Sequence, residues 1–252
     1  MTDAAQSAGM TLGEHLNELR SRIVKSVFAI LVFTFLIWNR YETVFSFLRR
    51  PFDVAHREHP EAILALTGVT SGLSMQLNVA LVGGTILSSP IWIFQIWRFI
   101  APGLHPKEKR WTFGFTVIAL PMFLAGCWLG YVALPHTLDA LFSFTPTEVT
   151  NVTNVENYIS FSLHLTLFFG LGFLIPVIML GANVFGLVSG RSLLRSWRWV
   201  VVGSFFFGAI ATPNGDPLGM TIIALPIVVL CFSVVGLALL IDKRRATRIT
   251  DV

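Results

Sequence analysis

The sequence predicts an all-α polytopic membrane protein with six transmembrane helices, several of them kinked by proline. Hydrophobic residues make up 54% of the 252-residue chain and charged residues 13%, which leaves too little polar surface for a soluble domain of this size. The uncharged windows are long, and a helix needs about 20 apolar residues to cross a hydrocarbon core of about 30 Å. A single membrane domain is therefore expected over residues 1–252.

The six spans follow from the uncharged windows taken in order. Four windows are easily long enough, and the first becomes so when Ile23, Val24 and a snorkelling Lys25 are counted. No small-residue cleavage site follows the first apolar run, so no cleavable signal peptide is expected. The spans are predicted near residues 23–41, 72–99, 112–134, 157–183, 199–212 and 219–241.

The basic residues predict the orientation of these spans. With both termini on one side, that side holds 14 of the 18 Lys and Arg residues. The other four, Arg40, Arg49, Arg50 and Arg57, lie in the first loop on the opposite side. Cytoplasmic segments carry the excess of Lys and Arg, so the chain is predicted to be N-in and C-in. The family resemblance described below implies that the membrane is the bacterial cytoplasmic (inner) membrane.

The N-terminal segment has a helix-start signal of its own. Thr11 and Glu14 match a capping box, and apolar residues then recur at helical spacing up to Ile23. This pattern predicts a short amphipathic helix on the cytoplasmic membrane surface that runs into the first span. The loop after that span, Arg40–Thr70, is long enough to form a small cap.

Two features distinguish the spans from a straight bundle. Prolines punctuate four of them and are expected to bend the helices, at Pro90, Pro121, Pro176 and Pro226. The fifth apolar run, Trp199–Ala211, has 13 residues and reaches only about 20 Å. Such a short span requires a thinner bilayer or partner helices beside it.

Two other classes of membrane protein fit the sequence less well. An intramembrane protease needs a nucleophile and a His within the spans, but Gly72-Leu-Ser74 lies at the start of a span and lacks the small residue that should follow it. A secondary transporter is the main alternative, although polar candidates such as His164 and Asn78 are few and no charged residue lies mid-span. No catalytic residue, metal site, cofactor or nucleic-acid partner is expected.

The carboxylates on the cytoplasmic side are the remaining candidates for chemistry. Glu18 and Glu108 lie there among basic residues. Taken singly, Glu18 is explained by an ion pair with Arg22 one turn along its helix, and Glu108 by a solvated loop. Taken together, two acids on this surface would suit a cationic ligand.

Three motifs resemble a known family. They are HLNELRSRI at His15–Ile23, SPIWIFQIWRFIAPGLHPKEKR at Ser89–Arg110, and the region that contains Thr212-Pro213, Asp216-Pro217 and Ala224–Pro226. They resemble TatC, the multispanning component of the twin-arginine, Sec-independent protein translocase. The resemblance extends over about residues 11–242.

The resemblance implies a receptor rather than an enzyme. Such a protein recognises twin-arginine signal peptides of folded cargo and works with TatA- and TatB-type single-span subunits, as a homo-oligomer in membrane lipid. The family's signal-contacting acids match Glu18 and Glu108. Arg20, Phe99 and Gln95 match further family positions, and Arg20 is expected to orient Glu18.

The sequence departs from the family at two places. The family usually has Glu in the fourth span where this chain has Leu174, and a polar residue in the sixth span where Gly219, Met220 and Phe232 stand. His164 is ten residues from Leu174, about 15 Å along the helix, and is a poor replacement.

Overall fold

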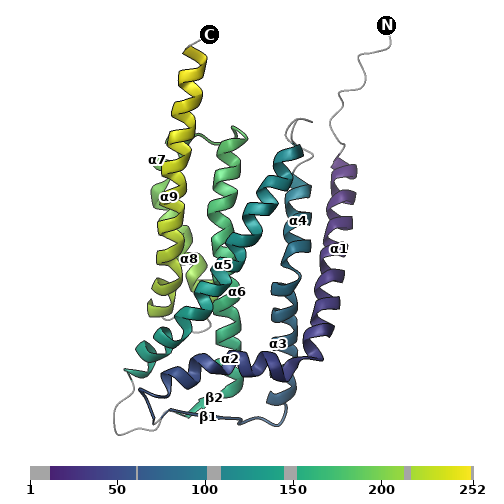
Figure 1. Cartoon of the computed structure of the whole chain (residues 1–252), viewed down its shortest axis with the longest axis vertical. Coiled ribbons are helices and arrows are strands. Elements are labelled where there is room, and N and C mark those ends of the chain that lie inside the picture. The colour runs from purple at the N-terminus through teal and green to yellow at the C-terminus, as the bar shows by residue number, and fades with distance from the viewer. Residues whose placement is uncertain (1–11, 61, 101–108, 145–151, 213–216, 251–252) are drawn as a thin grey trace.

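The computed structural model describes residues 12–60, 62–100, 109–144, 152–212 and 217–250. Helices make up almost all of this part of the chain (Figure 1), with two short strands. In chain order the elements are α1 (Leu12–Trp38), α2 (Tyr41–Ala55), β1 (Ile63–Ala65), α3 (Ser71–Leu87), α4 (Ser89–Ile100), α5 (Lys109–Phe142), β2 (Val152–Asn154), α6 (Val155–Val184), α7 (Gly190–Arg195), α8 (Trp197–Ala211) and α9 (Pro217–Thr250).

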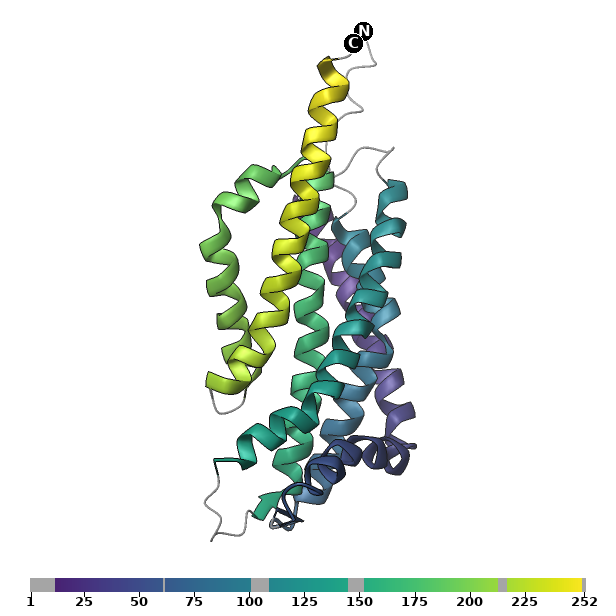
Figure 2. The same ribbon diagram turned by 60° about the vertical axis from the view of Figure 1, so that its left-hand side comes forward.

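The long helices run side by side, and the two ends of the molecule differ. The start of α1 and the end of α9 lie at the same end, together with the far end of α4 (Figures 1 and 2). The opposite end carries α2, which lies across the long helices, and the strands β1 and β2. We call these the terminal end and the cap end.

The prediction of a helical membrane protein is confirmed. Among the described residues, four helices are long and apolar enough to cross a membrane: Gly13–Trp38, Gly114–Phe142, Val155–Val184 and Pro217–Arg244. The pair α3 and α4 makes a fifth if it is counted as one broken span. The remaining predicted span, the fifth, corresponds to α8, which has 15 residues and is short, as the sequence indicated.

The predicted N-terminal amphipathic helix is not a separate element. Leu12–Trp38 is one 27-residue helix, so the motif residues after Leu12 and the first span share one axis. The helix packs closely on α3, where a Cβ added to Gly84 would lie 2.6 Å from the backbone nitrogen of Thr34. Small residues permit such close approach between membrane helices. The predicted cap residue Thr11 lies outside the described residues.

The second predicted span is broken near Pro90. The axes of α3 and α4 differ by 55°, which confirms the predicted kink. The Thr85 carbonyl, near the end of α3, accepts hydrogen bonds from the Trp92 indole at 2.9 Å and the Ser88 hydroxyl at 3.1 Å. Side chains therefore satisfy a backbone group at the break, as a membrane environment demands.

The other prolines do not break their helices. Pro121, Pro176 and Pro226 lie inside α5, α6 and α9, which continue on both sides of them. The third span was predicted near residues 112–134, which implies that the helix ends before Pro135. That boundary is wrong, because α5 includes Pro135 and continues to Phe142.

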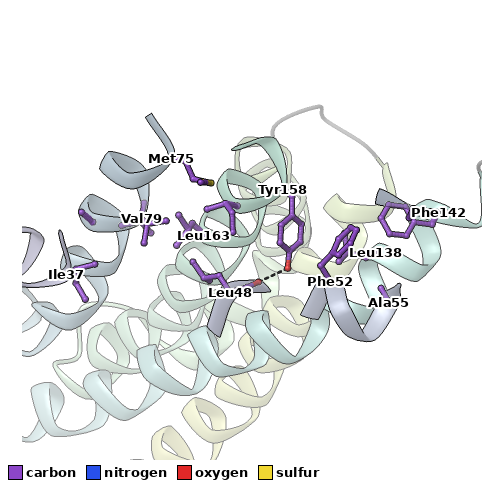
Figure 3. Packing of buried hydrophobic residues seen from close by; sticks show 14 residues of the cluster. Ile37, Leu48, Phe52, Ala55, Met75, Val79, Leu138, Phe142, Tyr158 and Leu163 are labelled. Carbon is purple, nitrogen blue, oxygen red and sulfur yellow. Dashed lines mark hydrogen bonds between the residues drawn. The ribbon is translucent and has the colours of Figure 1, made fainter. Parts of the chain in front are cut away.

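The cap end is held together by apolar packing and one long-range hydrogen bond. In α2, Leu48 and Phe52 are buried and face α6, where the Tyr158 hydroxyl donates to the Leu48 carbonyl at 2.7 Å (Figure 3). The strands pair in parallel, with Ile63 opposite Val152. The all-α prediction did not include this two-stranded sheet, which joins the two loops at the cap end.

The terminal end has a polar junction of its own. Gly186 follows α6 with a φ of 75°, which glycine tolerates. Its N–H donates to Asn183 and that of Leu187 to Ala182, as in a Schellman motif. Asp242 of α9 then accepts from the Asn183 side chain at 3.1 Å and the Gly190 N–H at 2.6 Å. One carboxylate thus joins α6, α7 and α9.

Candidate functional site

The first turns of α1 hold a carboxylate and a guanidinium in direct contact. Glu18 and Arg22 lie four residues apart on α1 and form an ion pair, as helical spacing allows. Both the Nε of Arg22, at 3.1 Å, and its Nη2 donate to the same oxygen, Oε1 of Glu18. The other oxygen, Oε2, is buried and accepts no hydrogen bond from the described residues.

The facing helix α4 contributes the second wall of the site. Gln95 Oε1 accepts from Nη1 of Arg22 at 3.4 Å. One turn further along α4, the Phe99 ring stacks on the His15 ring with centroids 4.6 Å apart. These two contacts tie the start of α1 to the end of α4, although the residues lie more than 70 positions apart in the sequence.

Two depressions meet at Arg22. The first is a polar cleft of about 360 Å³ lined by Glu14, Asn17, Glu18, Ser21, Arg22, Lys25 and Arg98. The second is an apolar groove of about 310 Å³ between α1 and α4, whose lining includes Ile23, Trp92, Ile96 and Phe99. The site therefore places a polar cleft, lined by two carboxylates and three basic side chains, directly beside an apolar groove.

The structure brings three of the five predicted site residues together. Glu18, Gln95 and Phe99 lie at the cleft and the groove. Arg20 is exposed, and the ion pair recorded for Glu18 is with Arg22, so Arg22 rather than Arg20 holds that carboxylate. Glu108 lies outside the described residues.

Glu18 and Arg22 are largely buried at this site. The Glu18 side chain is 18% exposed and that of Arg22 is 12% exposed, because α4 covers this part of α1. Helical spacing predicted the Glu18–Arg22 pair as the plain explanation of Glu18, and that pair forms. No role was predicted for His15 or Arg98, although both lie inside the motifs quoted above.

The intramembrane polar candidates are paired within the helix bundle. Nδ1 of His164 contacts the Ser160 carbonyl of its own helix at 2.6 Å, and Asn78 donates to the Ser160 hydroxyl at 2.8 Å. Leu174 packs against the aromatic cluster that contains Trp92 and Phe123. An apolar side chain suits that environment, although the family usually has Glu there.

Comparison with known proteins decides the family. The family model described as "Sec-independent protein translocase protein (TatC)" matches residues 14–226, most of the chain. The chain belongs to the TatC family. The match includes the residues that form the cleft on α1 and the groove on α4, and the predicted resemblance is thereby confirmed.

Individual relatives agree with this assignment. The TatC protein of Xylanimonas cellulosilytica is 36% identical over 240 residues, which cover 95% of this chain and 87% of the relative. That of Rothia mucilaginosa is 34% identical and covers 97% of this chain and 84% of its own length. A crystal structure of the twin arginine translocase receptor TatC, in DDM, superposes with a TM-score of 0.80 at 29% identity and covers 89% of this chain and 99% of that one.

The family establishes a transport component rather than a type of catalysis. The chain is a component of the Sec-independent protein translocase and a membrane protein with several apolar helices. Among the described residues, no group of His, Cys, Asp and Glu side chains is arranged to hold a metal ion.

Proposed function

We propose that this TatC family member is the receptor for signal peptides that carry two consecutive arginines. The observation that supports it is the meeting of the polar cleft and the apolar groove at Arg22. A signal peptide has a positively charged region followed by an apolar one of about 7–15 residues. The carboxylate of Glu18 suits the first region, and the groove between α1 and α4 suits the second.

The hydrogen bonds of Glu18 suggest how an arginine is read. Arg22 uses only Oε1, and a buried polar atom without a partner costs about 1–3 kcal/mol. A peptide guanidinium that approaches end-on donates to both oxygens in the fork geometry that carboxylates prefer. The incoming arginine therefore displaces Arg22 from Glu18 and gains the contact that Arg22 leaves unused. Gln95, already 3.4 Å from Arg22, receives the displaced side chain.

Selectivity for arginine follows from the same exchange. Arg22 competes equally with every ligand of Glu18, so it lowers the affinity for arginine and for lysine by the same factor. A lysine ammonium cannot donate to both carboxylate oxygens in the fork geometry. It therefore compensates for less of the binding energy that is lost when Arg22 leaves Glu18. Competition by Arg22 therefore leaves a twin-lysine peptide bound too weakly for recognition, while a twin-arginine peptide still binds.

The remaining predicted residues complete the proposal. Glu108 is the second acid and takes the second arginine. Phe99 forms the floor of the groove, where His15 holds its ring. Arg20, which is exposed on α1, belongs to the cationic surroundings of Glu18 rather than to its direct contacts.

The proposal includes a setting for the site. The chain crosses the bacterial cytoplasmic membrane six times as a single domain, with both termini in the cytoplasm, and α8 and α9 are the fifth and sixth spans. The terminal end, where the cleft lies, then faces newly made cargo. TatA- and TatB-type single-span subunits and further copies of the chain complete the translocase that exports folded proteins.

Site-specific photocrosslinking tests the receptor proposal. A photoreactive amino acid at Ile96, in the groove, should capture a twin-arginine peptide, and the same amino acid at Leu81, on the lipid-facing side of α3, should not. The two native side chains are similar in size and exposure, since Ile96 is 48% exposed and Leu81 is 52% exposed. Equal capture at both positions, or equal capture of twin-lysine and twin-arginine peptides at Ile96, would contradict it.

A further inference from the structure

A third depression lies toward the cap end, away from the peptide site. It has a volume of about 520 Å³ and is lined by aliphatic and aromatic side chains of α1, α2, α3, α5 and α6. Ile37, Phe47, Leu87 and Trp128 are among them. The proposed peptide site does not use this pocket.

The rim of the pocket is aromatic. The Phe47 ring of α2 stacks on the Tyr131 ring of α5, with centroids 4.2 Å apart and planes within 7°. The Tyr131 hydroxyl donates to the Phe47 carbonyl at 2.9 Å, and Trp128 lies 6.0 Å from Tyr131. Tyr and Trp concentrate at the level of lipid headgroups, so this rim marks a membrane–water boundary.

An available cation stands at the same rim. Arg50 lies one turn after Phe47 on α2, on the same face, and is near enough to Tyr131 for its charge to act on that side chain. Its side chain is exposed, and no ion pair is recorded for it within the described residues. Its neighbour Arg49 pairs with Asp53 at 3.2 Å. Arg50 is therefore placed to bind an anion at the mouth of an apolar pocket.

We propose that this pocket binds one anionic phospholipid, with an acyl chain against Phe47, Leu87 and Trp128 and the phosphate at Arg50. The charge of Arg50 complements a phosphate, and the apolar lining complements a hydrocarbon chain. An apolar transmembrane helix fits less well, because it brings no anion to Arg50.

The headgroup supplies the selectivity of this site. Lipid tails are as apolar as leucine, so moving a chain from the bilayer into the pocket gains little. A basic residue near the membrane surface is worth about 1 kcal/mol toward an anionic lipid, which is a factor of about five. Loss of Arg50 should therefore reduce the preference for anionic over neutral lipid without emptying the pocket.

Native mass spectrometry of the purified full chain, with phosphatidylglycerol or phosphatidylcholine added, tests the site. Leu87→Trp fills the pocket and should lower retention of phosphatidylglycerol at least about fivefold. Leu81→Trp is the matched control, since Leu81 and Leu87 lie on α3 with 52% and 51% exposure and only Leu87 lines the pocket. Arg50→Gln should reduce the phosphatidylglycerol preference about fivefold, and Arg57→Gln, an exposed arginine at the same end, should not.

Specific results would overturn the proposal. Equal retention by Leu81→Trp and Leu87→Trp would show that lipid binds elsewhere. Equal retention of both lipids by the wild-type chain would remove the role of Arg50. If a twin-arginine peptide displaced the bound lipid from the wild-type chain, the occupant in function would be the peptide.

Discussion

Exchange at Glu18 can be tested by changing each member of the ion pair separately. Glu18→Gln removes the charge that receives the peptide arginine. A hydrogen bond to a charged group is worth about 1.5–3 kcal/mol, so affinity for a twin-arginine peptide should fall about 10- to 100-fold. Arg22→Gln removes the competitor and should raise the affinity for twin-arginine and twin-lysine peptides by the same factor, up to about tenfold.

The side chains of Glu18 and Arg22 are 18% and 12% exposed, and this partial burial determines how much each variant lowers the stability of the protein. Breaking a fully buried ion pair by removing one partner costs about 3–5 kcal/mol. This pair lies at the end of one helix and retains some access to water, so each variant should lose less than that and still insert. Thermal unfolding of the purified variants provides this control.

The assay is binding of a fluorescent twin-arginine peptide to membranes that hold each variant, with the twin-lysine peptide as the comparison. The two variants should move affinity in opposite directions. If Arg22→Gln weakens binding as much as Glu18→Gln does, Arg22 positions the acid rather than competing for it, and the exchange is refuted. If the Glu18→Gln variant binds the twin-arginine peptide as tightly as wild type and prefers it over the twin-lysine peptide to the same degree, the arginine-binding residues lie elsewhere.

Four further outcomes are expected. Cysteine at Ser192, at the terminal end, should react with an impermeant thiol reagent only from the cytoplasm, and cysteine at Glu58, at the cap end, only from outside; the reverse pattern contradicts the proposed topology. Insertion of four Leu residues within α8 should impair transport and leave peptide binding intact, because a span of about 22 Å becomes one of about 28 Å; unimpaired transport would make the short span incidental. Asp242→Ala should lower stability by about 1–3 kcal/mol in thermal unfolding, since it leaves the Gly190 and Asn183 donors without this acceptor, whereas Asp242→Asn should lose less. His164→Leu should preserve peptide binding with at most a modest transport defect, and complete loss of coupling to the proton gradient would favour the transporter alternative.

The sequence predicted the helices because hydrophobicity and charge act over many residues at once. A window such as Asn157–Gly190 has enough apolar residues that its helix, α6, is insensitive to any single one. Boundaries depend on fewer contacts. Pro135 suggested a helix end at α5, but a proline only weakens a helix, and the burial of Leu138 and Phe142 against α2 and α6 keeps the chain helical.

The site was predicted in its residues and less well in its contacts. Motif resemblance located Glu18, Gln95 and Phe99, because these side chains belong to continuous sequence runs. It assigned the orientation of Glu18 to Arg20, whereas helical spacing favours Arg22, four residues away. The stacking of His15 on Phe99 and the use of only one Glu18 oxygen depend on how α4 crosses α1, which no local pattern specifies.

The break between α3 and α4 lets the wall of the groove take a direction different from that of α3. Asn78 fastens α3 to α6 at 2.8 Å, while the 12 residues of α4 extend about 18 Å beyond the break toward Phe99. A tilt of about 10° at the break would carry the far end of α4 sideways by about 3 Å, with α3 held in place. Because α1 is unbroken beside α4, such a tilt would change the width of the groove between α1 and α4. A groove of adjustable width would fit the apolar segments of signal peptides that differ in side-chain size.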